Sequence, residues 1–285
     1  MLLMTILGDQ MMSNTKRWLV ACVLSVACFN SYAADGGFLA ALASPDRPAA
    51  DKERDAARKP AQVIEFLGIE SGMTVLDALA GAGYYTEVLS GAVGPDGKVV
   101  SQNSEWVLQI RGGANATVLK EKAARLSNVE ILLRDFNPAQ LSPELTSRLN
   151  VVNGPVDLGP LTTRKEIYDG KIDLAITALN LHDAYIFGGE AGAVTFLQNI
   201  FTALKPGGVL GVIDHVGIAG QNNSRLHRIE KGMAMTFLKY AGFVIEAESD
   251  LLANPKDDHT LPMRDPSLGR NTDRMLIKAR KPANS

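Results

Sequence analysis

The sequence predicts an α/β fold in which helices cover both faces of a mostly parallel sheet. Two observations predict this fold class. Short apolar segments typical of buried strands alternate with segments whose apolar residues have helical spacing. The first strand segment, residues 74–78, leads into the glycine-containing turn 80–83 and then into a helix that begins at Tyr84. A strand, a tight turn and a helix in this order are typical of βαβ units, whose strands are parallel.

Each element has a local reason in the sequence. Pro60 suits a first helical turn, the apolar residues after it form one face, and Gly68 ends the helix. The turns 94–97 and 206–208 each contain proline and glycine, and each separates a helical segment from the next strand. The predicted strands are 74–78, 99–101, 129–133, 172–177, 209–213, 243–247 and 275–279. The other predicted helices include 84–91, 116–127 and a last helix at 224–240.

The first 33 residues have the three parts of a secretory signal peptide. Lys16 and Arg17 precede an apolar run at 18–29, and small residues stand before the expected cut after Ala33. The run is too short for an ordinary transmembrane helix, so we predict a periplasmic or secreted protein with no stable membrane anchor. Lipid attachment at Cys22 is the alternative. Residues 34–50 are predicted to form a polar lead segment, and residues 51–282 the folded domain.

Composition excludes several classes of function. Both cysteines, Cys22 and Cys28, lie in the signal peptide, so the processed chain would have no disulfide and no cysteine nucleophile or metal ligand. The net charge of −2 gives no general attraction to nucleic acid. We therefore predict a small-molecule substrate as the partner. The sequence does not predict an oligomeric state.

The turn after the first strand predicts a ligand site. Ligands of open parallel sheets bind beyond the carboxyl ends of the strands, and here the strand ends at Asp77 and is followed by Gly81 and Gly83. Glycines let the backbone approach a ligand closely. A dinucleotide-binding turn would have a third glycine where this chain has Thr86, which disfavours NAD and FAD.

The chain resembles the class I S-adenosylmethionine (SAM)-dependent methyltransferases and, more narrowly, the exported predicted methyltransferases of unknown substrate. The segments that carry the resemblance occur in order between residues 54 and 282. They are "RDAARKPAQVIEFLGIESGMTVLDALAGAGYYTEVLS", "LNLHD", "LKPGGVLGVIDH", "HRIEKGM", "AGFVIEAESDLL" and "TDRMLIKARKP". The resemblance implies a Rossmann-like fold with a seven-stranded sheet whose last strand is antiparallel. It also implies SAM as the cofactor.

The resemblance further implies which residues would bind SAM. They are the turn residues Asp77, Ala78, Gly81 and Gly83, then Asn103 at the ribose, Asp135 at the adenine, and Asn180 at the methionine end or the acceptor. Two positions depart from the pattern. Leu79 stands where the turn usually has its first glycine, and Asn103 replaces an acidic residue that would bind the ribose hydroxyls more strongly.

Methyl transfer requires alignment of donor and acceptor, and a base where the acceptor must lose a proton. We predict His182 as the base, oriented by Asp183 or Asp214, with His215 as a further catalytic residue. No metal site is predicted. His227 and His259 complete the four histidines of the chain.

Three functions remain open from the sequence. The first is a SAM-dependent methyltransferase that acts on a small-molecule acceptor in the cell envelope. The second is a binding protein that has the methyltransferase fold but no catalytic activity, which Leu79 and Asn103 would explain. The third is a metal-dependent hydrolase or lyase that uses the histidines and aspartates named above, since imidazole and carboxylate suit Zn²⁺ or Mn²⁺.

Overall fold

The computed structural model describes residues 36–136 and 168–284. The expected signal peptide, the cut near Ala33 and Cys22 lie outside the described residues, and so does most of the long connection before the fourth strand. Within the part that is described, no helix combines the length and apolar character needed to cross a membrane.

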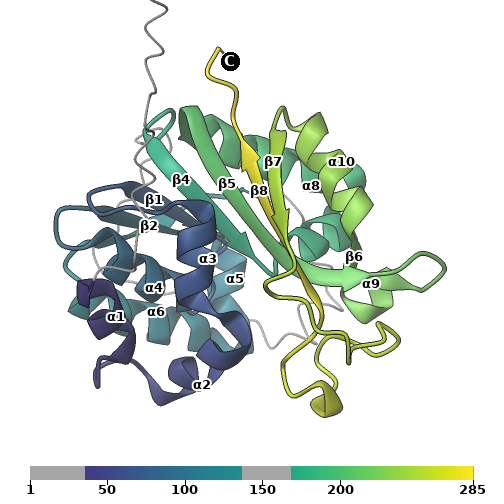
Figure 1. The fold of residues 1–285 in the computed structure, drawn as a ribbon, viewed down its shortest axis with the longest axis horizontal. Helices are drawn as coiled ribbons and strands as arrows, with labels where there is room; N and C mark the ends of the chain where they lie inside the picture. The colour runs from purple at the N-terminus through teal and green to yellow at the C-terminus, as the bar shows by residue number, and fades with distance from the viewer. Residues whose placement is uncertain (1–35, 137–167, 285) are drawn as a thin grey trace, which may run out of the picture. The chain divides into compact units, whose positions relative to one another are not determined.

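The sheet confirms the predicted fold class. Its main path has the order β3-β2-β1-β4-β5-β8-β7, and β8 is antiparallel to both neighbours while the other strands are parallel (Figure 1). The strands are β1 (Thr74–Ala78), β2 (Lys98–Asn103), β3 (Val129–Leu133), β4 (Ile172–Ala178), β5 (Leu204–Gly217), β7 (Val244–Ser249) and β8 (Arg274–Arg280). The order reverses between β1 and β4, which is where ligands bind in sheets of this kind.

Helices cover both faces of this sheet (Figure 1). Alternate residues of a strand point to opposite faces, so Val75 packs with α1, α3 and α4, while Leu76 packs with α8 and α10. The helices are α1 (Gly36–Ala43), α2 (Ala49–Arg58), α3 (Pro60–Leu67), α4 (Tyr84–Val93), α5 (Glu105–Gln109), α6 (Ala114–Arg125), α8 (Leu181–Ala203), α9 (Asn223–Leu226) and α10 (Lys231–Tyr240). The short 3₁₀ helices are η1 (Arg111–Gly113) and η2 (Pro266–Leu268).

The predicted single helix at 224–240 is wrong. Helix α9 ends at Leu226, where its C-cap residue His227 has a left-handed φ of 51°, and α10 begins only at Lys231. Between them the two-residue strand β6 (Ile229–Glu230) pairs with the end of β5. The break buries Arg228 completely, where it forms an ion pair with Asp257. A partner so distant in the sequence could not be read from the helical spacing.

The segment before α2 contains a helix. In α1, Phe38 is 5% exposed and packs in the same apolar cluster as α3 and α4. This helix therefore adds to the core on the face that α4 covers.

Candidate functional site

A cavity of about 680 Å³ lies beyond the carboxyl ends of β1 and β4. Its floor includes Asp77 and the turn after β1, together with Asn180 after β4 and His215 near the end of β5. Helix α2 and the segment 263–274 supply further walls. The cavity thus occupies the place where the strand order reverses, as the sequence predicted for a ligand site.

The end of β2 holds the turn after β1 in place. Leu79, at a left-handed φ of 53°, donates its N–H to the Gln102 side-chain oxygen at 2.9 Å. Gly81 donates its N–H to Asn103 Oδ1 at 2.8 Å. The two glycines have different surroundings. A Cβ on Gly81 would first meet Asn115 Nδ2 at 3.9 Å, whereas one on Gly83 would lie 2.8 Å from Leu119 Cδ1.

Asp77 lies at the bottom of the cavity and is 3% exposed. Burial raises the pKa of its carboxyl group to about 6, although the bond from Thr86 opposes that rise. Thr86 Oγ1 donates to Asp77 Oδ2 at 2.7 Å and lies 2.9 Å from Ser101 Oγ. The residue that replaces the third glycine therefore orients the carboxylate of the site.

The structure does not bring every predicted cofactor residue to the cavity. Gly81 and Asn180 line it, but Asn103 and Asp135 do not. Asn103 is fully buried, its Oδ1 accepts the bond from Gly81, and its Nδ2 has no partner among the described residues. Asp135 is exposed.

His182 is enclosed by carboxylates. Its Nδ1 lies 2.6 Å from Asp214 Oδ1, and its backbone N–H donates to Asp214 Oδ2 at 2.8 Å. On the other side of the ring, Nε2 lies 3.2 Å from Asp183 Oδ1. Burial lowers the pKa of His182, but the charges of Asp214 and Asp183 outweigh it and raise this pKa to about 10. The fully buried ring is therefore positively charged at neutral pH and has no lone pair with which to accept a proton.

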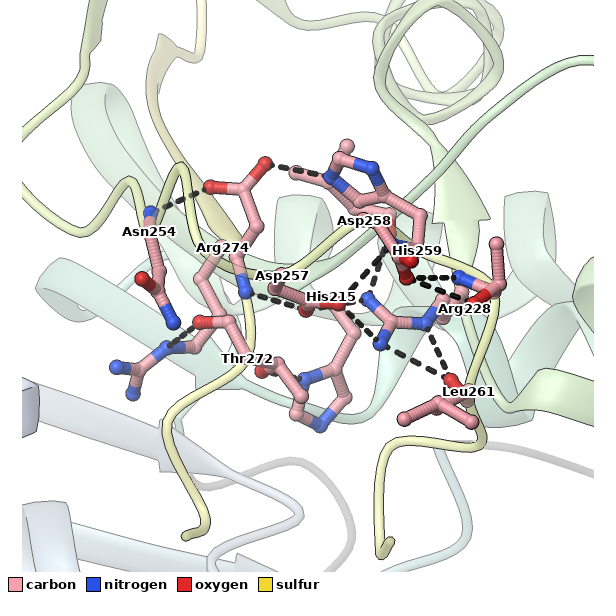
Figure 2. A network of polar contacts seen from close by, with 12 residues as sticks. His215, Arg228, Asn254, Asp257, Asp258, His259, Leu261, Thr272 and Arg274 are labelled. Atoms are coloured by element: carbon pink, nitrogen blue, oxygen red, sulfur yellow. Dashed lines mark hydrogen bonds and ion pairs between the residues drawn. The ribbon is translucent and has the colours of Figure 1, made fainter. Parts of the chain in front are cut away.

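His215 is the histidine that lines the cavity. Its Nδ1 lies 2.6 Å from Thr272 Oγ1, as Figure 2 shows, and its backbone N–H donates to Asp214 Oδ1. Burial, with the positive charges of His182 and Arg274, lowers the pKa of His215 well below its usual value. The neutral ring has Nδ1 engaged by Thr272, which leaves Nε2 for a ligand.

His227 extends this group of histidines. Its Nδ1 lies 2.9 Å from Asp183 Oδ1, and its ring centroid is 5.8 Å from that of His182. One ligand atom each of His182, Asp183 and His227 lie within 4.8 Å of one another, close enough to share a cation. His259 is not part of the group, because its Nε2 pairs with Asp273 at 2.9 Å.

The segment that follows β7 forms one wall and is held by a buried ion pair. Arg228 donates to both oxygens of Asp257, at 2.9 and 3.0 Å, and to the Leu261 carbonyl (Figure 2). Asp257 also accepts the N–H groups of His259 and Asp273. Sequence reasoning missed this pair, because 29 residues separate its members.

Arginines make up much of the cavity wall, and sequence reasoning missed these as well. Six of them line it, against the acidic Glu53, Asp77 and Asp265. No apolar pattern or motif marks residues that come from separate elements and meet only in the folded chain.

Comparison with known proteins agrees with this fold. Residues 49–137 match the family model of protein-L-isoaspartate(D-aspartate) O-methyltransferase. No curated protein matches the sequence. A SAM-dependent methyltransferase from Aquifex aeolicus is similar in structure, with 19% identity, a TM-score of 0.53, and coverage of 81% of this chain and 95% of that one. The [4+2]-cyclase SpnF has 18% identity, a TM-score of 0.52, and coverage of 86% and 91%.

These comparisons identify the fold as that of the class I SAM-dependent methyltransferases. The matched segment runs from α2 to β3 and contains the turn after β1. The similarity to a cyclase shows that the same fold supports different reactions, so activity has to be argued from the site.

Proposed function

We propose that the protein is a SAM-dependent methyltransferase that acts on a small-molecule acceptor in the cell envelope. One observation carries this proposal. The turn after β1 presents Gly81, whose Cβ position is open to 3.9 Å, to a cavity at the reversal of the strand order. That turn lies in the segment which matches a methyltransferase family model.

The residues at the cavity fit the methionine half of SAM. Asn180 Nδ2 donates to the carbonyls of Ala78 and Ala178, which leaves Oδ1 to accept from an amino group. Asp77 supplies a carboxylate beside it, and Gly81 leaves room for the cofactor backbone. At the expected ribose position, Asn103 is buried outside the cavity lining and its Oδ1 accepts the Gly81 N–H, so we assign it the role of holding the turn and no bond to the ribose.

The residue proposed to accept the proton from the methyl acceptor is His215. SAM supplies an electrophilic methyl group. The chain aligns the acceptor with that group beside a base that is neutral. With Nδ1–H donating to Thr272, Nε2 of His215 accepts the acceptor's proton once bond formation has made that proton acidic. His182, charged and buried behind His215, keeps that base from protonating early, so its proposed role is positioning.

Ligand-induced stabilisation tests this function against the two alternatives. S-adenosylhomocysteine at 100 times its dissociation constant should add about 2.7 kcal/mol to the free energy of unfolding. A thermal-shift series would compare it with SAM, NAD and Zn²⁺. Stabilisation by Zn²⁺ and not by S-adenosylhomocysteine would favour the metal-dependent enzyme. Binding of SAM without turnover of any acceptor would favour the non-catalytic binding protein.

A further inference from the structure

Within the described residues, five of the six cavity arginines have no carboxylate partner. Arg54 pairs with Asp51. The other five are Arg58 on α2, Arg111 on η1, and Arg264, Arg270 and Arg274 on the segment before and into β8. Across residues 36–136 and 168–284, no carboxylate oxygen lies within the 4.0 Å of an ion pair from any of these five guanidinium groups.

Two of these arginines form an inner pair. Arg274 is 4% exposed, and its guanidinium donates only to neutral groups, at Ala57 O, Thr272 O and Asn271 Oδ1. Arg58 lies over the ring of Tyr84 at 4.3 Å. Burial, together with the charge of Arg58, lowers the pKa of Arg274. A buried cation without an anion is costly, so this pair fits a negatively charged ligand better than an empty cavity.

The other three form an outer trio at the cavity wall. Burial and the charges of Arg264 and Arg270 lower the pKa of Arg111, so three like charges from two segments oppose one another. Arg111 and Arg270 also have left-handed backbones, with φ of 56° and 60°. Four of the seven described non-glycine residues with positive φ line this cavity, the others being Leu79 and Leu179. Such strain concentrates at ligand sites.

The arginines are a local feature. The chain as a whole has a net charge of −2, so its general composition does not explain a cluster of cations. Guanidinium groups bind carboxylate and phosphate through two parallel hydrogen bonds. An anion between the arginines would replace their mutual repulsion with charge-assisted bonds.

We propose that the methyl acceptor is an anion whose carboxylate or phosphate group is held by Arg111, Arg264 and Arg270, while its reacting atom faces His215. This inference rests on the proposed function in one respect, namely that the bound anion is the methyl acceptor. The anion site itself stands on the arginines alone.

Inorganic phosphate is the probe for the site, and the test pair is a double variant with a charge-matched control. The test variant is Arg264→Gln with Arg270→Gln, both exposed residues. The control is Arg225→Gln with Lys239→Gln, which are exposed and lie outside the cavity lining. At constant ionic strength, phosphate should raise the melting temperature of the wild type and of the control. The test variant should bind phosphate about tenfold more weakly for each arginine removed.

A cofactor comparison identifies which anion the arginines hold. S-adenosylhomocysteine has a carboxylate that 5′-methylthioadenosine lacks. We expect the test variant to bind both within a few-fold of the wild type, since the arginines serve the acceptor. Weaker binding of S-adenosylhomocysteine alone would assign them to the cofactor's carboxylate and overturn the proposal.

Two further results would be decisive. Equal phosphate binding by test variant and wild type would show that Arg264 and Arg270 hold no anion, and would overturn the proposal. Phosphate binding that depends on Arg264 and Arg270, without any binding of S-adenosylhomocysteine, would support the anion site while it contradicts the methyltransferase function. Because the substituted arginines make no partner contacts in the described chain, the variants should melt at the wild-type temperature or above without phosphate.

Discussion

His182 and His215 contact the same carboxylate, Asp214, and yet differ in charge at neutral pH. Asp214 accepts from the ring of His182 but only from the backbone of His215. The ring of His182 therefore has Asp214 as a counter-ion, whereas the ring of His215 has the charged ring of His182 as a neighbour. This difference is the basis for the roles proposed above, positioning for His182 and general base for His215.

This difference in charge is measurable in the isolated protein. We expect the ring of His182 to titrate near pH 10, because Asp214 and Asp183 stabilise its charged form. The ring of His215 should stay neutral at pH 6.5 and above, because burial and His182 oppose its protonation. Nitrogen-15 NMR of the histidine rings checks both, with His182→Gln and His215→Gln to assign the signals. A His182 signal that titrates at its ordinary pKa of 6.5 would contradict the assignment.

The same pair predicts how stability depends on pH. The pKa of His182 is raised from 6.5 to about 10 on folding, so its contribution is complete below pH 6.5 and is lost as pH rises toward 10. Urea unfolding across this range should show the loss in the wild type and not in His182→Gln. That variant should also lose about 3–5 kcal/mol at pH 6, because a buried carboxylate is left unpaired.

Catalysis separates the two histidines more directly. With an acceptor in hand, His215→Gln should lower turnover by about 10²- to 10⁴-fold, the usual effect of losing a general base, while affinity for S-adenosylhomocysteine stays within a few-fold. Initial rates and calorimetry measure the two quantities. The sequence-based prediction of His182 as the base would be favoured instead if His215→Gln kept full turnover and His182→Gln lost it.

Sequence could locate these residues but not assign their charges. The alternation of strands and helices placed His182 and His215 at strand ends, which the structure bears out in position. The pKa of His182 depends on Asp214, which lies 32 residues away, and the pKa of His215 depends on its burial and on His182. No local pattern encodes these contacts or the depth of burial. Asn103 and Asp135 show the same limit, since strand ends alone do not decide which side chains reach the cavity.

The turn between β1 and α4 contains two glycines with different roles. One of them packs against a helix, and the other lines the cavity. Gly83 has a φ of 73°, and its Cβ position is blocked by α6 through Leu119. Gly81 has a φ of 58°, and a Cβ there would make only an ordinary contact with Asn115 Nδ2 at 3.9 Å. The turn therefore has one residue that sets helix packing and one that leaves room for a ligand.

Substitutions at the two glycines should change different properties, the free energy of unfolding at Gly83 and ligand binding at Gly81. Gly83→Ala should lower the free energy of unfolding by about 1–3 kcal/mol, because the added methyl overlaps Leu119. Gly81→Val should abolish stabilisation by S-adenosylhomocysteine, and Gly81→Ala provides a less strained version of the same test. Denaturation and calorimetry measure both. Unchanged affinity in a folded Gly81→Val protein would mean that the turn does not contact the ligand.

Elements were predicted well wherever local signals define them. All seven strands of the main path overlap the predicted segments, because apolar segments bounded by glycine and proline are local features. The bounds of β5 were wrong, since it runs from Leu204 to Gly217 and includes the predicted turn 206–208. The region 224–240 was not predicted correctly, because its helix is broken where Arg228 is buried against Asp257. Long-range pairing decided that region.

At the scale of the whole molecule, the position of the first described helix is compatible with the expected signal-peptide cleavage after Ala33. Helix α1 begins at Gly36, and Phe38 is packed against the face that α4 covers. Cleavage after Ala33 would leave this helix complete. We propose export on this basis and on the signal-like sequence, and we expect the mature chain to start near Ala34.

Intact-mass measurement of protein from a periplasmic extract checks this start. A mass that retains Lys16 and Arg17 would refute cleavage, and an added lipid mass at Cys22 would support the lipoprotein alternative. A start beyond Phe38 would remove part of the core and should lower the melting temperature.

The ion pair of Arg228 and Asp257 bears on how such a protein could be redesigned. It fixes a segment that carries Thr272, Arg264 and Arg270, while the cofactor turn comes from the segment 49–137. The proposed acceptor arginines Arg264 and Arg270 thus lie on a different segment from the turn after β1, while Arg111, the third of them, lies within 49–137. Exchanging residues 253–273 together with Arg228 would therefore move two of the three proposed acceptor arginines with their own ion-pair anchor, and leave Arg111 and the turn after β1 untouched.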